Sequence, residues 1–176
     1  MITNLSLSSS VNLEEELNIK EDIIEELFTE IVDFILKNDK VKKISNNKYL
    51  FNDYAKEIEM DLYFCKNNEM HELNKKYRDI DSTTDVLTFV IQEDEPVIID
   101  IPILHLGEII ISTDKIIEQA KENNHSNIAE VIILISHGVL HLLECHHDTE
   151  EMYNNILNIQ NQTLEHISDT KDLIIY

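Results

Sequence analysis

Three histidines in the last third of the 176-residue chain have the residue type and the spacing of metal ligands. His137 and His141 are four positions apart, and side chains four apart on a helix lie on the same face. The pair therefore predicts two imidazole ligands for one metal ion. His147 completes the spacing HxxxHxxxxxH. It can reach the same ion only if the chain turns back just after Leu143, because a continued helix would rotate it away from the pair.

Three neutral imidazoles are the donor set of a catalytic zinc site rather than of a closed structural one. They leave the ion its full charge and one open position, where bound water reaches a pKa of about 7. We therefore expect one zinc ion per chain, held by these three histidines. Three residues beside the third histidine are alternative ligands, namely Cys145, His146 and Asp148.

A metalloprotease is an alternative interpretation of this spacing, because metzincin proteases share it. In those enzymes a glutamate follows the first histidine and acts as the general base. In this chain Gly138 occupies that position. A peptidase would therefore lack its base, and the sequence disfavours one.

The charge balance restricts what the surface can bind. The chain has 35 acidic and 14 basic residues, which gives a formal net charge of −21. This is the reverse of a nucleic-acid-binding surface, where Lys and Arg neutralise the phosphates. A nucleic-acid substrate would therefore depend on a local basic pocket, on the metal, or on a protein partner that delivers it.

Hydrophobic periodicity predicts the elements that must position these groups. Apolar residues recur at helical spacing over Leu13–Leu36 and alternate as in a strand over Ile58–Phe64. Two more strands are predicted over Thr84–Ile91 and Leu104–Ser112. A further helix is predicted to begin at Asn68, with Met70, Leu73 and Tyr77 on its buried side. Another is predicted to begin at Ser112 or Thr113. Two more are predicted from Ser126 or Asn127 to Leu143 and from about Thr149 to about His166. This order predicts an α+β domain in which helices cover a small sheet.

The chain is expected to form one domain over residues 1–176, since no linker or repeat divides it. Residues 1–12 are expected to be a loosely ordered arm, in which Ser6–Ser10 form a loop after a short strand that has Leu5 and Leu7 on one side. The segment Asp94–Ile103 contains both prolines and is expected to be a connection.

The two cysteines and the apolar segments indicate the compartment. Cys65 and Cys145 form neither a CxxC pair nor a disulfide framework. The chain shows no secretory signal and no apolar run long enough to span a bilayer. We therefore expect a cytoplasmic protein with no membrane partner.

Four segments carry motifs that occur together, in this order, in one known family. Leu73–Asp79 resembles LNxxYR, and Thr84–Phe89 resembles T-D/N-VLSFP with valine in place of the proline. Leu106–Ser112 resembles LGDIxIS with glutamate for aspartate, and Ser136–Asp148 resembles HGxLHLxGYDH. Together they resemble the YbeY family of bacterial rRNA-maturation endoribonucleases, and the similarity runs from about residue 58 to residue 164.

The resemblance implies a fold, a cofactor and a function. It implies an α+β fold with a small mixed sheet, and zinc bound by His137, His141 and His147 at the mouth of a groove. It implies cleavage of single-stranded RNA, with a role in maturing the 3′ end of small-subunit (16S) rRNA and in ribosome quality control. The expected partners are ribosomal RNA in the small ribosomal subunit, a ribosomal protein and an assembly GTPase.

Arg78 is the expected catalytic residue beside the metal. It is the only arginine among 14 basic residues and falls in the LNxxYR-like segment. Its planar guanidinium can bind a phosphate through two hydrogen bonds, which a lysine cannot do. We therefore expect Arg78 to stabilise the charge that develops during phosphodiester hydrolysis, with Lys75 and Lys76 widening the local positive patch.

Two features test this assignment. Glu144 stands where the family has glycine, and a left-handed turn there would cost a non-glycine residue roughly 1 kcal/mol. The only two glycines, Gly107 and Gly138, fall inside the family motifs, and at Gly138 a side chain would obstruct substrate or a close strand.

An alternative function is that of a ribosome-assembly binding factor whose metal is mainly structural. The strongly acidic composition suits docking on a basic protein better than it suits a free nuclease. The residues alone leave both functions open.

Overall fold

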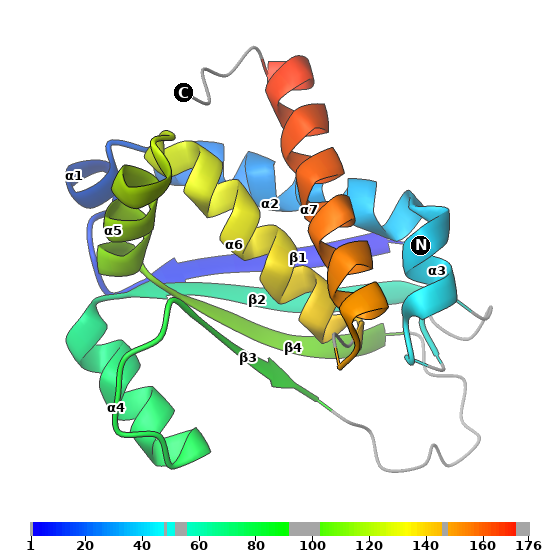
Figure 1. Cartoon of the computed structure of the whole chain (residues 1–176), viewed down its shortest axis with the longest axis horizontal. Helices are drawn as coiled ribbons and strands as arrows, with labels where there is room; N and C mark the ends of the chain where they lie inside the picture. The colour runs from blue at the N-terminus through cyan, green and yellow to red at the C-terminus, as the bar shows by residue number, and fades with distance from the viewer. Residues whose placement is uncertain (1, 48, 52–55, 92–102, 146–147, 172–176) are drawn as a thin grey trace.

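A four-stranded sheet runs through the molecule, and most of the helices lie over one of its faces (Figure 1). The structure is a computed structural model that describes residues 2–47, 49–51, 56–91, 103–145 and 148–171. In chain order its elements are β1 (Ile2–Ser9), α1 (Leu13–Leu17), α2 (Glu21–Lys37), α3 (Asp39–Ile44), β2 (Glu57–Cys65), α4 (Asn67–Arg78), β3 (Val86–Val90), β4 (Ile103–Ser112), α5 (Thr113–Asn123), α6 (Asn127–Leu142) and α7 (Glu150–Lys171).

The sheet is mixed, with strand order β1-β2-β4-β3. β1 and β4 run parallel to β2, whereas β3 runs antiparallel to β4. The predicted α+β class with a small mixed sheet is therefore confirmed. β3 lies at one edge, and no other strand of the described residues pairs with its outer side.

The two faces of the sheet are covered by different helices. Successive strand residues point to opposite faces. In β4, Ile109 and Ile111 belong to the main core, which includes the apolar faces of α2 and α6. Ile110 faces the other way and packs with Met70 of α4 and Leu87 of β3 in a second, smaller cluster. α6 and α4 therefore lie on opposite faces of the sheet.

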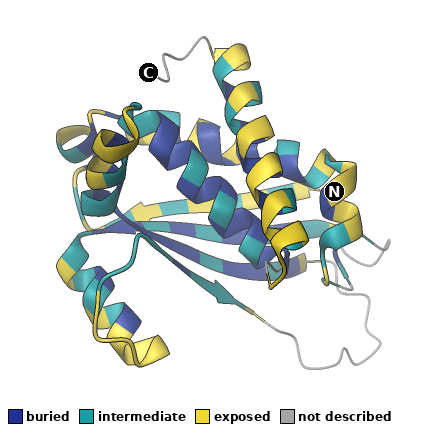
Figure 2. Ribbon diagram, in the orientation of Figure 1, coloured by how far each residue is buried: buried dark blue, intermediate teal, exposed yellow. Residues whose placement is uncertain are grey.

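α6 is the element that carries two of the candidate ligands. Its first turn is capped by Ser126, whose Oγ accepts a hydrogen bond from the backbone N–H of Ala129 at 3.4 Å. The helix packs against β3 and β4 below and against α2, α5 and α7 around it, and it is buried along most of its length (Figure 2). A helix held on so many sides presents its side chains from a rigid frame. No helix within the described ranges is long and apolar enough to cross a membrane.

The N-terminal segment differs from its prediction. Ile2–Ser9 form an edge strand whose partners in β2 run from Glu57 to Phe64. The predicted short strand with Leu5 and Leu7 on one side is therefore confirmed, whereas the loosely ordered arm is wrong for residues 2–9. Ser6 to Ser9 lie within this strand rather than in a loop. The physical reason is tertiary, because β2 supplies the backbone partners and the core receives Leu5 and Leu7.

Two helix predictions also need correction. The helix predicted over Leu13–Leu36 is divided, because Asn18 adopts a left-handed conformation (φ 58°) and ends α1. Tyr77 was predicted to be buried, but it is 55% exposed. Its ring instead contacts the edge of Phe89, with centroids 5.1 Å apart. The predicted connection Asp94–Ile103 lies outside the described residues except for Ile103, which begins β4.

Candidate metal centre and phosphate contact

The two histidines of α6 meet at one point. Their Nε2 atoms are 2.9 Å apart, and the ring planes are inclined by 68°. Two nitrogens bound to one tetrahedral zinc ion at about 2.0–2.1 Å lie about 3.3 Å apart. A small opening of the rings would therefore admit an ion, and imidazole nitrogen is a donor that zinc prefers. His137 and His141 thus fit the donor pair that the spacing predicts.

The third predicted ligand cannot be placed in the same way. His147 and the alternative ligand His146 lie outside the described residues. Among the residues that are described, no group of three or more His, Cys, Asp and Glu side chains could hold a metal ion. The zinc ion and its third histidine therefore remain predictions.

The helix ends where the predicted site requires it. α6 stops at Leu142, and Glu144 adopts φ 55° in the left-handed region. The backbone N–H of Glu144 donates to His141 O at 2.9 Å, and the N–H of Cys145 donates to Leu140 O at 3.0 Å. These two bonds form a Schellman motif, which closes a helix and redirects the chain. The expectation of a left-handed turn at Glu144 is confirmed.

Arg78 is the last residue of α4 and is exposed to solvent. It forms no hydrogen bond or ion pair with any other described residue. Its basic neighbours already have partners. Lys75 Nζ forms an ion pair with Asp81 at 3.0 Å, and Lys76 Nζ lies 4.7 Å from the centroid of the Tyr77 ring. In a chain with a net charge of −21, this guanidinium is thus available to an external anion.

The segment after Arg78 is held against α4. Asp79 ends the helix in a left-handed conformation, and the buried Asn74 donates from Nδ2 to Ser82 O at 2.7 Å. Asn74 Oδ1 is buried and has no hydrogen-bond partner among the described residues. The Asn74 side chain therefore holds the turn that follows Arg78 against α4.

The residues next to Arg78 and next to His141 lie near the same end of the edge strand β3. On one face of the sheet, Tyr77 contacts Phe89 of β3. Val90, the next residue, pairs with Gly107. On the other face, a Cβ atom added to Gly107 would lie 3.2 Å from Leu142, the residue after His141. The helices that carry Arg78 and the histidine pair, α4 and α6, lie on opposite faces of the sheet.

Both glycines allow close backbone approach. A Cβ atom on Gly107, which has φ 132°, would lie 1.9 Å from Phe89 O. A Cβ atom on Gly138 would lie 2.5 Å from Ile109 Cγ2. Of the two obstructions that the sequence left open at Gly138, the structure shows the close strand. Gly138 therefore lets α6 pack close to β4, and this close packing determines how far the histidine pair lies from the sheet.

Replacing Gly138 by alanine is expected to destabilise the fold by up to about 2 kcal/mol. The cost of overpacking a core, about 1–3 kcal/mol, exceeds the roughly 1 kcal/mol that alanine gains in helix propensity. Urea unfolding would measure the change. The double variant with Ile109→Ala should lose less stability than the sum of the two single variants, because the colliding methyl group is gone. Strictly additive losses would contradict the steric explanation.

Cys145 is a buried thiol rather than an exposed ligand. Burial, followed by the nearby charge of Glu144, raises the pKa of Cys145 to about 12. Burial and the charges of Glu69 and Asp114 likewise raise the pKa of Cys65 to about 12. The sequence left Cys145 open as an alternative ligand, and the structure favours its packing role.

Both cysteines are therefore expected to resist a thiol reagent in the folded protein. At pH 8, a thiol of pKa 12 is ionised to only about one part in ten thousand. Reaction with a chromogenic disulfide should release colour only as fast as the protein unfolds, and at once in 6 M guanidinium as the control. Rapid labelling of one thiol per folded chain would contradict this prediction.

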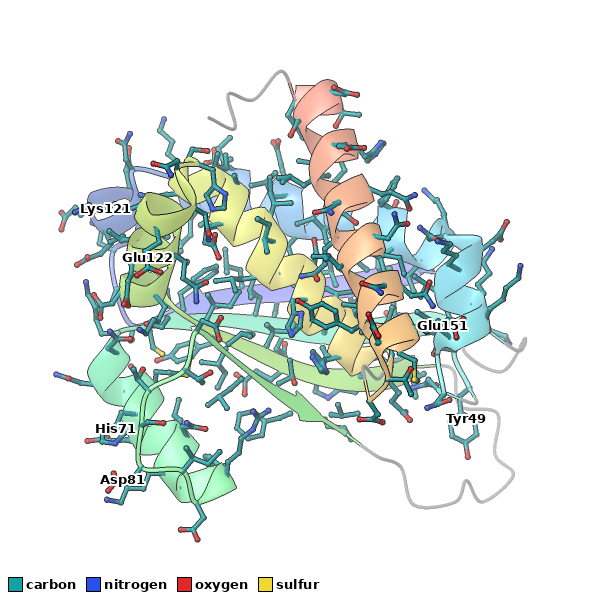
Figure 3. All side chains as sticks on the ribbon, in the orientation of Figure 1. Tyr49, His71, Asp81, Lys121, Glu122 and Glu151 are labelled. Carbon is teal, nitrogen blue, oxygen red and sulfur yellow. The ribbon has the colours of Figure 1, made fainter. Side chains whose placement is uncertain are left out.

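The histidines outside the signature pair with carboxylates. In Figure 3, His71 of α4 points toward Asp81, and their atoms are 2.9 Å apart. The other three pairs are His105 with Asp61, His125 with Glu130, and His166 with Glu30. Each of these four histidines therefore has a carboxylate partner outside the candidate metal site.

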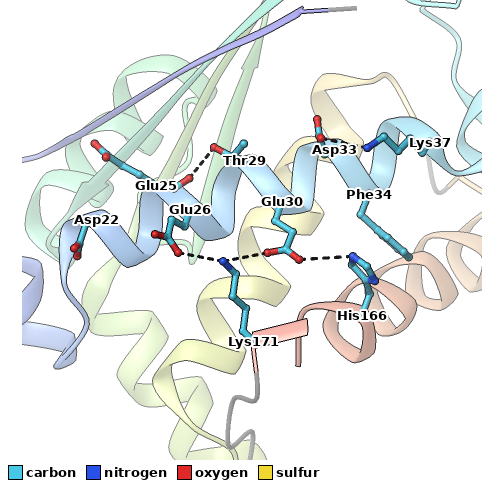
Figure 4. Close-up of a pocket in the computed structure, with 10 residues that line it drawn as sticks. All are labelled: Asp22, Glu25, Glu26, Thr29, Glu30, Asp33, Phe34, Lys37, His166 and Lys171. Carbon is cyan, nitrogen blue, oxygen red and sulfur yellow. Dashed lines mark hydrogen bonds and ion pairs between the residues drawn. The ribbon is translucent and has the colours of Figure 1, made fainter. Parts of the chain in front are cut away.

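A separate pocket of about 760 Å³ lies between α2 and the C-terminal half of α7 (Figure 4). Five carboxylates face it: Asp22, Glu25, Glu26, Glu30 and Asp33. Lys171 forms ion pairs with Glu26 and Glu30 at 3.1 and 3.4 Å. Because Lys37 and Lys171 are the only lysines among the lining residues, the negative charges of the pocket outnumber the positive ones. The pocket contains none of the candidate ligands and would repel a phosphate.

Comparisons with known proteins agree with the motifs. The chain matches the family described as Endoribonuclease YbeY over residues 10–168. A protein of that name from Clostridioides difficile is 34% identical over 76% of this chain and 88% of its own length. Another from Staphylococcus saprophyticus is 42% identical over 66% of this chain and 76% of its own.

One solved structure is similar in fold. The solution structure of a Thermotoga maritima protein aligns with a TM-score of 0.54 and covers 96% of this chain and 93% of its own. Its sequence identity to this chain is 21%, so the likeness concerns the fold alone.

Proposed function

This chain belongs to the YbeY endoribonuclease family, and we propose that it is a metal-dependent endoribonuclease that cleaves single-stranded RNA. Its proposed role is to mature the 3′ end of small-subunit (16S) rRNA and to take part in ribosome quality control. The observation that carries the proposal is the convergence of His137 and His141, whose Nε2 atoms are 2.9 Å apart inside the motif that resembles the family signature.

The proposed cofactor is one zinc ion per chain, held by His137, His141 and His147. Bound zinc supplies a Lewis acid and lowers the pKa of its water to about 7. The half-buried position of His137 and His141 on α6 supports this role, since a rigid helix holds both imidazoles in place before the ion arrives. Cys145 is fully buried and its thiol lies near Leu143 O, which favours a packing role for Cys145 over a ligand role.

Arg78 is the proposed catalytic residue. Its guanidinium would bind the non-bridging oxygens of the phosphate and stabilise the charge that develops there. Its exposure and its lack of a carboxylate partner among the described residues support this role. An RNA strand that crosses the edge of β3 could meet Arg78 from one face and the histidine pair from the other.

An RNA-cleavage assay with matched substrates tests the proposal. The protein would be incubated with one RNA sequence in single-stranded and in duplex form, and with an rRNA fragment that carries an unprocessed 3′ end. We expect cleavage of the single strand and of the fragment, loss of cleavage with a chelator, and recovery with zinc. Cleavage that survives both the chelator and His141→Ala would mean that another nuclease is present and that the proposal fails.

A binding factor in ribosome assembly is the second candidate function. The net charge of −21 and the five carboxylates at the α2–α7 pocket favour a basic protein partner, such as a ribosomal protein or an assembly GTPase. His141→Ala discriminates between the candidates in cells. A variant that loses zinc but still binds small subunits and restores growth would favour binding over catalysis.

A further inference from the structure

Glu144 is an unusual residue for the turn that it forms. Four non-glycine residues in the described chain have positive φ, and three of them are Asn18, Asp79 and Asn124. Asn and Asp tolerate this region because their short side chains bond locally to the backbone. Glu144 has no such local compensation in its own side chain. The left-handed turn therefore needs support from elsewhere in the fold.

The support comes from three consecutive residues that follow α3. Ser45 Oγ donates to Leu143 O at 2.6 Å, and the Asn46 N–H donates to Glu144 O at 3.3 Å. Asn47 Nδ2 donates to Glu144 Oε1 at 3.2 Å. Figure 1 shows α3 beside the C-terminal end of α6. We call residues 45–47 the clasp, because they bind two successive carbonyls and the side chain of the turn.

The clasp is itself held in place. Asn47 Oδ1 accepts hydrogen bonds from the N–H groups of Tyr49 and Leu50, both at 3.1 Å. The Asn47 N–H donates to Ser45 Oγ at 3.2 Å, and Leu50 is buried. Both ends of the Asn47 amide are therefore engaged, one by its own loop and the other by Glu144. Such an amide has one orientation and can hold the turn rigidly.

We propose that Asn47, with Ser45, is a positioning residue of the metal site. It holds Glu144 in the left-handed conformation and so sets the direction in which the chain leaves α6 at Cys145, ahead of the segment that contains His147. The motif HGxLHLxGYDH has a glycine at this position, and glycine adopts a left-handed backbone without strain. In this chain a contact between segments 97 residues apart is present instead. The inference rests on the proposed function, because it requires that a metal binds.

A double-mutant cycle on Asn47 and Glu144, with zinc affinity as the measured quantity, tests the proposal. Asn47→Ala, Glu144→Gly and the double variant would be prepared as full chains, and zinc affinity would be measured by competition with a chromogenic chelator. Asn47→Ala should weaken zinc binding about 10-fold, which is the lower range for residues that orient metal ligands. Glu144→Gly should bind zinc as the parent does, and in that background Asn47→Ala should change affinity less than about 2-fold.

A cobalt(II) spectrum and a control variant separate positioning from general stability. Asn47→Ala should alter the visible spectrum of the cobalt-loaded protein, and Glu144→Gly should restore it. Asn38→Ala is the control, because Asn38 caps α3 through the Lys40 N–H at 2.9 Å and has no bond to Glu144. It should lower stability in urea and leave zinc affinity unchanged.

Three results would overturn the proposal. Zinc affinity unchanged by Asn47→Ala, while the parent binds zinc and cleaves RNA, would remove the clasp's role and keep the proposed function. An equal loss in the Glu144→Gly background would show that Asn47 does not act through the turn. A parent chain that binds no zinc would overturn the proposed metal site, and the clasp's role with it.

Discussion

Replacing His141 by alanine is expected to reduce bound zinc from about one ion per chain to less than a tenth of that, and to abolish RNA cleavage. His141 supplies one of two nitrogens that converge within 2.9 Å, and a site with one histidine of the pair cannot complete a tetrahedral set. His137→Ala and His147→Ala should behave alike if all three histidines are ligands. Elemental analysis of untagged protein, after reconstitution with zinc, measures the metal directly.

His166→Ala is the matched control for this prediction. His166 is also half-buried on a helix, but it stacks on Phe34 and lies 3.7 Å from Glu30. The control should retain its zinc and its activity. If His141→Ala kept a full zinc ion, another set of residues would hold the metal, and the histidine site would be wrong. Loss of zinc in the two pair variants but not in His147→Ala would leave the pair and reassign the third ligand.

Replacing Arg78 by alanine is expected to lower kcat/KM for RNA cleavage about 100- to 1,000-fold, which corresponds to about 2.7–4 kcal/mol of transition-state stabilisation. Folding stability should change by less than about 0.5 kcal/mol, because Arg78 is exposed and has no partner among the described residues. Cleavage kinetics and urea unfolding on the same preparations measure the two quantities separately. Equal losses of stability and activity would refute the catalytic role.

Two neighbouring substitutions sharpen the Arg78 experiment. Arg78→Lys keeps the positive charge but loses the planar guanidinium that makes two hydrogen bonds to a phosphate. It should therefore be more active than Arg78→Ala and less active than the parent. Lys75→Ala removes a charge of the same sign three positions away, where the ammonium already pairs with Asp81. It should reduce activity much less than Arg78→Ala does. Losses of similar size would mean that the region contributes a diffuse positive field rather than a specific phosphate contact.

The acidic surface restricts where RNA can approach. Five carboxylates spread along α2 line the α2–α7 pocket, and Lys37 and Lys171 are the only lysines that line it with them. RNA phosphates should be repelled there and accepted near Arg78. The charge distribution therefore suits a nuclease that holds its substrate at few points, as well as a protein that docks its acidic side on a basic partner.

Predictions from local pattern succeeded where neighbouring residues decide the structure. The alternation of Ile58, Met60, Leu62 and Phe64 predicted β2, and all four are buried. The spacing of His137 and His141 predicted that their imidazoles meet, and they do. Both features depend on side chains within about four positions, where the periodicity of strand or helix leaves little choice.

By itself, the sequence determined the main helices and strands, the mixed α+β class through the family motifs, and the left-handed turn at Glu144. The packing of distant segments was needed to show that the first strand continues through Ser6–Ser9, that Gly138 is required by Ile109, and that residues 45–47 hold the turn at Glu144. These contacts join segments far apart in the chain, such as the 97 residues between Asn47 and Glu144. Hydrogen bonds of this kind depend on how the packed elements meet, and periodicity along the chain carries no signal for them.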